Sequence, residues 1–152
     1  MANTQAMCTS FMGELLTGTH NFTPSTGDTF KAALYLASAT YNSSTTAYSS
    51  TGEVTGTNYT AGGINVTNAN APASTNASAT AGTAYWTPSA SLSYSNVTLS
   101  TAFDAVLIYN SSKSNRSVSV HTFGSQTVTA GTFTLTMPSN TTSTALIRLA
   151  TT

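Results

Sequence analysis

The sequence predicts an all-β fold, an antiparallel β-sandwich or jelly-roll, with a short N-terminal helix. The chain is rich in Ser and Thr, and it also contains seven Tyr, six Phe and one Trp. Thr, Val and aromatic residues favour pleated strands, whereas disordered chains of similar polarity lack them. Turn-forming residues divide the chain into roughly seven to nine short segments of alternating polarity, which is typical of a β-sandwich and not of an α/β fold.

The N-terminal segment has helical periodicity, unlike the segments that follow it. Its apolar residues recur at i, i+3, i+4, i+7 and i+8, at Cys8, Phe11, Met12, Leu15 and Leu16. Asn3 or Thr4 could cap the start of this helix, and Gly18 could end it. We therefore divide the chain into a helical attachment segment, residues 1–17, and a single β-sandwich domain, residues 18–152. The segment is predicted to be dispensable for folding, although its stripe could instead cover the domain's own core.

The first expected strands are separated by long polar connections. Alternating residues predict strands at 29–36, 64–67 and 84–87. Residues 38–58 are polar and interrupted by Gly, so they predict a long connection with at most one turn of helix, near residues 46–48. Residues 68–82 are small and polar and predict a loop.

The C-terminal half contains the strongest strand signals. We expect one or two short strands within residues 92–99, a strand buried on both faces at 105–109, and a hairpin turn at 110–115. Half-buried strands are expected at 117–121, 132–137 and 145–149. In the strand at 132–137, Phe133 and Leu135 share one face and are predicted to be fully buried.

The low charge of the chain restricts its partners. Charged residues are 5% of the sequence, with four basic and four acidic side chains and a net charge of zero, compared with about 25% in ordinary domains. No basic field is present to attract nucleic acid or an anionic membrane. No apolar run approaches the ~18 residues of a membrane span, and no secretion signal is visible. A net charge of zero favours association, so we expect a homo-oligomer or a component of an assembly.

The sequence offers few groups for catalysis or metal binding. His20 and His121 are the only two histidines, no G-x-S-x-G elbow is present, and Cys8 is the single cysteine. These residues give no recognisable nucleophilic, metal or cofactor site. His121 is predicted to lie at the surface or between subunits, and Asp104 to accept backbone hydrogen bonds or to pair with Arg116. The chain is predicted to be no enzyme and to need no cofactor.

Two stretches carry a resemblance to a known group of proteins. One runs from Phe30-Lys31-Ala32-Ala33-Leu34-Tyr35 to Tyr59-Thr60-Ala61-Gly62-Gly63, and the other from Phe103-Asp104-Ala105-Val106-Leu107-Ile108-Tyr109-Asn110 to Ala130-Gly131-Thr132-Phe133-Thr134-Leu135-Thr136-Met137-Pro138. Over residues 29–149, the chain resembles small virion structural proteins of tailed bacteriophages. The resemblance implies a virion protein that is assembled in the bacterial cytoplasm with other virion proteins, and it implies no catalytic residue.

Three roles remain open at this stage. The first is a capsid decoration or cement protein, and the second is a neck, tail or fibre component. The third is a carbohydrate-binding surface module, in which aromatic rings would stack on sugars. The candidate interface residues are four apolar helix positions and two adjacent aromatic residues, namely Phe11, Met12, Leu15, Leu16, Tyr85 and Trp86.

Overall fold

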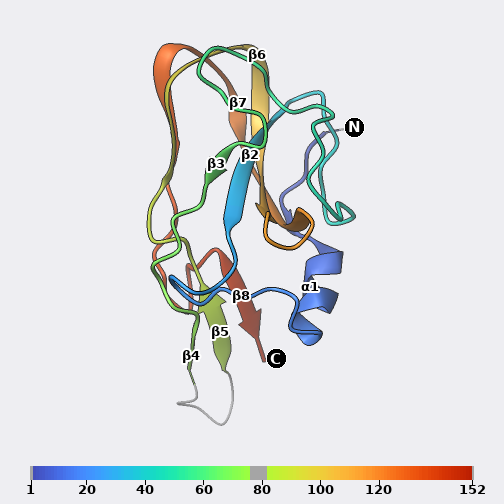
Figure 1. Cartoon of the computed structure of the whole chain (residues 1–152), viewed down its shortest axis with the longest axis vertical. Helices are drawn as coiled ribbons and strands as arrows, with labels where there is room; N and C mark the ends of the chain where they lie inside the picture. The colour runs from blue at the N-terminus through green and yellow to red at the C-terminus, as the bar shows by residue number, and fades with distance from the viewer. Residues whose placement is uncertain (1, 76–81, 152) are drawn as a thin grey trace.

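A computed structural model describes residues 2–75 and 82–151 as two antiparallel sheets and one short helix, α1 (Thr9–Leu16). The five-stranded sheet has the order β1-β7-β6-β2-β3, and the three-stranded sheet has the order β4-β5-β8 (Figure 1). The strands are β1 (Ala6–Met7), β2 (Phe30–Leu36), β3 (Ile64–Asn65), β4 (Ala73–Ser74), β5 (Thr83–Trp86), β6 (Leu92–Asn110), β7 (Arg116–Leu135) and β8 (Ile147–Ala150). The predicted all-β fold with a short N-terminal helix is confirmed.

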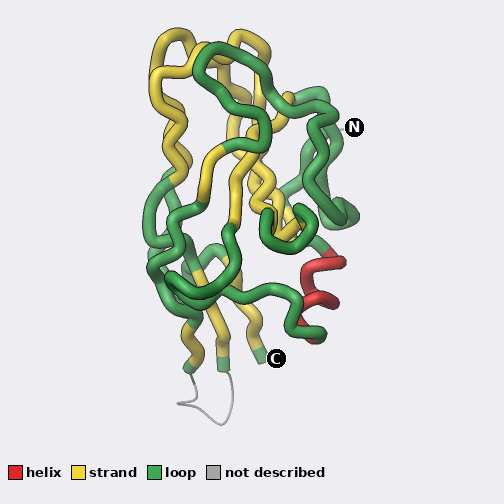
Figure 2. The backbone as a smooth tube through the Cα atoms, viewed as in Figure 1, coloured by secondary structure: helices red, strands yellow, loops and turns green. Residues whose placement is uncertain are grey.

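Two long strands, β6 and β7, form most of the structure. They contain 19 and 20 residues where the sequence predicted several short strands. Their pairing is interrupted by register shifts at five places, and Asn96 and Ala130 adopt positive φ angles there. Such bulges bend a strand pair, and Figure 2 shows the two strands turning back at one end of the molecule. The short strands were therefore correctly located, but the polar residues between them form bends and not loops.

The bend packs the two halves of this hairpin against each other. Phe133, near the end of β7, lies 5.0 Å from Phe103 and 5.0 Å from Phe123 between ring centroids. The hydroxyl of Tyr94 donates a 2.8 Å hydrogen bond to the backbone carbonyl of Ala32 in β2. The two halves of the β6–β7 ribbon, which both belong to the five-stranded sheet, therefore form two layers that pack around a sandwich-like core.

The centre of the five-stranded sheet is buried on both faces. In β2, residues 32–35 are all buried, and so are residues 105–109 of its neighbour β6. This confirms the predicted doubly buried strand. Gly63, immediately before β3, has φ +71°, and a Cβ there would lie 1.7 Å from the carbonyl oxygen of Ala32, so the close approach of the chain to β2 at this point requires glycine.

The helix begins later than its predicted caps suggested. Cys8 is the N-cap residue and makes no side-chain capping bond. The helix does not start earlier because residues 6–7 are extended and pair with β7 as β1. Asn3 instead donates to the carboxylate of Asp104 and to the carbonyl of Leu36. The predicted end is confirmed: Gly18 has φ +67°, and the amides of Gly18 and Thr19 close a Schellman motif on α1.

Two further predictions need correction. Phe133 and Leu135 are half-buried, since the second half of β7 covers the core from outside. Asp104 bonds to Asn3, and Arg116 pairs with Glu14 instead. The connection at residues 38–58 was predicted to contain at most one turn of helix, and residues 46–48 contain none; Ala47 makes an isolated β-bridge to Arg116. The predicted hairpin turn is confirmed between β6 and β7.

Candidate interaction surface

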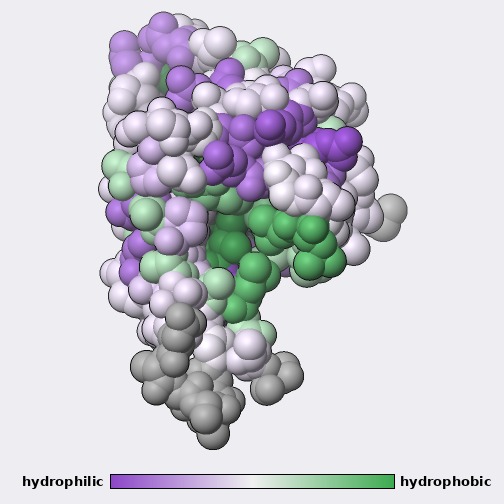
Figure 3. All heavy atoms as spheres, turned by 60° about the horizontal axis from the view of Figure 1, so that its bottom comes forward, coloured by the Kyte–Doolittle hydropathy of each residue, from purple (hydrophilic) through white to green (hydrophobic). Residues whose placement is uncertain are grey.

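An apolar cleft lies between α1 and the three-stranded sheet. Its volume is about 110 Å³, and Figure 3 shows an apolar hollow at this end of the molecule. The lining comes from the helix, the following loop and all three strands of the small sheet: Phe11, Leu15, Phe22, Pro72, Ala73, Ala84, Tyr85, Trp86, Ile147 and Leu149. None of these side chains is charged, so the cleft offers its occupant an apolar surface with little electrostatic steering.

The structure brings four of the six predicted interface residues together in this cleft, namely Phe11, Leu15, Tyr85 and Trp86. Met12 and Leu16 are the other two and lie on the same short helix. No local pattern indicated that residues near 11 and residues near 85 would meet, because they belong to different elements separated by most of the core.

The helix has an inner and an outer apolar side. Phe11 is fully buried, Met12 is 43% exposed and Leu16 is 90% exposed. On the other wall, Leu149 of β8 is 44% exposed. These three side chains are the large exposed hydrophobic residues of the described chain, and they belong to α1 and β8, two of the elements that contribute residues to the cleft.

The floor of the cleft is rigidly built. Trp86 is 3% exposed, and its indole Nε1 donates to the side-chain oxygen of Asn68 and to the carbonyl of Asn70. Phe22 stacks on Phe30 at 4.3 Å and lies 4.7 Å from Trp86. Sequence reasoning missed Phe22, because it is an isolated aromatic residue in a loop and has no periodic neighbours.

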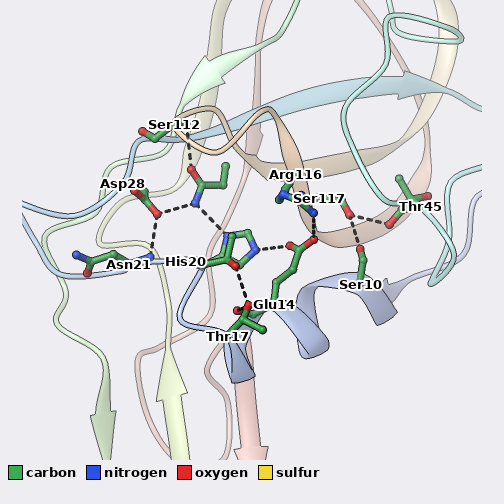
Figure 4. A network of polar contacts seen from close by, with 12 residues as sticks. Ser10, Glu14, Thr17, His20, Asn21, Asp28, Thr45, Ser112, Arg116 and Ser117 are labelled. Carbon is green, nitrogen blue, oxygen red and sulfur yellow. Dashed lines mark hydrogen bonds and ion pairs between the residues drawn. The ribbon is translucent and has the colours of Figure 1, made fainter.

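A polar network holds α1 against the turn between β6 and β7 (Figure 4). The carboxylate of Glu14 accepts from His20 at 2.6 Å and also pairs with Arg116 of β7. His20 is 8% exposed and contacts the ring of Phe11 at 4.9 Å. The network therefore fixes the helix that forms one wall of the cleft.

The hydrogen bonds around His20 show which of its two ring nitrogens carries the proton. The Asn110 side-chain oxygen accepts from the amide of Ser112, so its amino group donates both to Asp28 and to His20 Nδ1. His20 Nδ1 is thus an acceptor, and its Nε2 donates to Glu14. Both ring nitrogens are occupied, which leaves neither free to take a proton from a nucleophile.

Asp28 closes the network on the far side of Asn110. Burial opposes ionisation of this carboxyl, but bonds from the Asn110 side chain and the Asn21 amide outweigh it and lower its pKa. Lys113 lies 3.6 Å away and adds a favourable charge. The arrangement is that of a structural clamp with a carboxyl group at each end, Glu14 and Asp28.

His121 lies elsewhere, in a groove beside β1 and β8. It is half-buried, and its Nε2 is 2.8 Å from the hydroxyl of Ser119. Burial lowers the pKa of His121 to about 4. No cluster of three His, Cys, Asp or Glu side chains that could hold a metal ion occurs within residues 2–75 and 82–151. In the same part of the chain, no helix is long and apolar enough to cross a membrane.

Comparisons with protein-family models, with curated proteins and with solved structures found no match to this chain.

Proposed function

We propose that this chain is a non-catalytic structural component of a phage virion, most simply a capsid decoration or cement protein. It attaches to a neighbouring shell protein through the apolar cleft and through a rim, which we define as the exposed side chains Met12 and Leu16 of α1 and Leu149 of β8. The observation that supports the attachment is the 90% exposure of Leu16, which lies on the same helix as the cleft residues Phe11 and Leu15. The virion setting rests on the resemblance in residues 29–149.

The energetics support apolar attachment. Burial of a leucine side chain contributes about 1.5–3 kcal/mol, and Met12, Leu16 and Leu149 provide three large exposed hydrophobic side chains on α1 and β8, which both contribute residues to the cleft. Charged side chains are scarce in this chain, and exposed ion pairs contribute only about 0–1 kcal/mol each. The partner is therefore a protein that inserts an apolar side chain into the cleft and covers its rim.

A neck, tail or fibre position would use the same surface, whereas a carbohydrate-binding role is less well supported. Sugar recognition requires an exposed aromatic face. Trp86 is buried and hydrogen-bonded, and Tyr85 is half-buried. Neither ring offers an open platform for stacking.

The proposal is tested by adding purified protein back to virions assembled without it. Wild-type protein should rebind, and Leu16→Ser should lose most of its occupancy while keeping its melting temperature. Gly13→Ser is the matched control, because residue 13 is exposed on the same helix and a Cβ added there would have no neighbour within 4 Å.

Two results would contradict the proposal. Rebinding of Leu16→Ser at wild-type occupancy would exclude the rim as the attachment surface. Failure of wild-type protein to bind virions at any concentration, together with a dimer that Leu16→Ser dissociates, would identify the occupant of the cleft as a second copy of the chain.

A further inference from the structure

A second groove lies between the edges of the two sheets. It has a volume of about 460 Å³ and separates β1 and β7 on one side from β8 on the other. β1 is the outermost strand of the five-stranded sheet, and β8 is the outermost strand of the three-stranded sheet. The groove is therefore walled by two strand edges, and edges with unpaired backbone groups are natural sites for strand addition.

The register of β8 shows which of its backbone groups point into open space. The amide of Thr151 donates to the carbonyl of Gly82 at 2.9 Å, so these two residues form a hydrogen-bonded pair. Antiparallel pairs alternate between bonded and non-bonded, and the register pairs Thr83 with Ala150 and Tyr85 with Arg148. The backbone N–H and C=O groups of Arg148 and Ala150 consequently face away from β5.

The opposite wall has the same property. Cys8 donates its amide to the carbonyl of Val118, and Met7 is registered with Ser119. By the same alternation, the backbone groups of Met7 point away from β7. Met7, Arg148 and Ala150 all line the groove, and within the described residues no backbone partner bonds to their outward groups.

The charge of the groove indicates which kind of side chain a bound segment should carry. Arg148 is the permanently charged residue of the lining. Its guanidinium donates to the carbonyl of Ser143, and in the described part of the chain no carboxylate lies within ion-pair distance of it. Polar groups from Ser119 and His121 lie on the β7 side of the groove.

We propose that this groove binds an extended peptide segment of a partner protein by adding it as a strand to β8, with an acidic residue of the segment placed beside Arg148. Main-chain hydrogen bonds supply the affinity, and the single carboxylate supplies the preferred register. The proposal is independent of the apolar cleft, because the outward backbone groups of β8 need no contribution from α1.

The experiment measures binding of an acetylated, amidated hexapeptide, Thr-Val-Glu-Val-Thr-Val, to the full chain by titration calorimetry. Two altered peptides accompany it: one has its central amides N-methylated, and the other has Lys in place of Glu. The wild-type chain should bind the first peptide, bind the Lys peptide several-fold more weakly, and not bind the N-methylated peptide.

Three protein variants locate the site. Ala150→Pro removes an outward N–H without removing a bond to β5, a position where edge strands tolerate proline, and should weaken binding at least about tenfold. Arg148→Gln should weaken binding of the Glu peptide several-fold and should abolish the preference for the Glu peptide over the Lys peptide. Leu16→Ser should bind like wild type, which separates this site from the cleft beside α1.

Several outcomes would overturn the proposal. Absence of binding at millimolar peptide, equal binding of the N-methylated peptide, or unchanged affinity in a folded Ala150→Pro protein would each exclude strand addition at β8. If Ala150→Pro fails to fold, the N-methylated peptide still decides the question on the wild-type chain. A wild-type dimer that Ala150→Pro dissociates would assign the edge to a second copy of the chain.

Discussion

Replacement of Phe11 by Ala tests whether α1 is part of the core. Phe11 is fully buried, and its ring contacts His20 at 4.9 Å and Phe22 at 6.0 Å. It therefore connects the polar clamp on one side of the helix to the aromatic floor of the cleft on the other. Leu16→Ala provides the matched control, since Leu16 is on the same helix and 90% exposed.

The expected loss of stability follows from the burial of the ring. Truncation of a buried Phe to Ala costs about 3–5 kcal/mol. Phe11 also lines the open cleft, so water or neighbouring side chains can reach the space that the substitution creates, and we expect a value near the lower limit, about 3 kcal/mol. For a domain of this length, that corresponds to a fall in melting temperature of roughly 6–12 °C.

The assay is unfolding followed by circular dichroism, in urea at 25 °C and on heating. Leu16→Ala should change the free energy of unfolding by less than about 0.5 kcal/mol, as surface substitutions usually do. A change below about 1 kcal/mol in Phe11→Ala would refute the reasoning, because it would mean that the helix contributes little to the core.

Three further predictions concern the sheets. Leu135→Ala should lower the free energy of unfolding by only about 1–2 kcal/mol, below the usual range for a fully buried leucine, because Leu135 is half-buried. Urea unfolding measures this loss. A loss above about 3 kcal/mol would show that Leu135 is fully buried after all. Tyr94→Phe should cost about 1–2 kcal/mol, since the Ala32 carbonyl loses its buried donor, and an unchanged urea midpoint would contradict this. Burial lowers the pKa of His121 from 6.5 to about 4, so the unfolded chain binds one more proton between these values and stability should fall as pH falls through that window, by up to about 3 kcal/mol. His121→Gln should flatten this part of the stability profile, and identical profiles for the two proteins would exclude the effect.

Local pattern was sufficient to predict the strand positions but not their continuity. Alternation located residues 92–99 and 105–109 because each half-strand buries one face or both faces. Between them, residues 100–102 are small and have the composition of a turn, although Phe103 after them is fully buried. They nevertheless stay in the ladder, because bulges at several positions let the ribbon bend without ending.

The candidate site was predictable in its residue types and not in its arrangement. The helical stripe identified Phe11, Met12, Leu15 and Leu16, but periodicity alone does not say which edge of a stripe faces the core. The pairing of β1 with β7 determines which edge of the stripe faces the core, since it orients the helix that follows. Phe22 and the bonds among Glu14, His20 and Asn110 depend on distant segments, and no local pattern indicates such contacts.

The structure also bears on the two roles considered for the N-terminal segment, as a lid or as an attachment element. Phe11 and Cys8 are fully buried while Leu16 is almost fully exposed, so one helix has surface for both roles. That residues 1–17 are dispensable for folding stays a prediction, and the packing argues against it. Their deletion would remove β1, the Asn3 bond to Asp104 and the Glu14 end of the clamp together. Loss of assembly in such a truncated chain would therefore say nothing about docking, whereas a single substitution at Leu16 removes the exposed side and leaves the buried side in place.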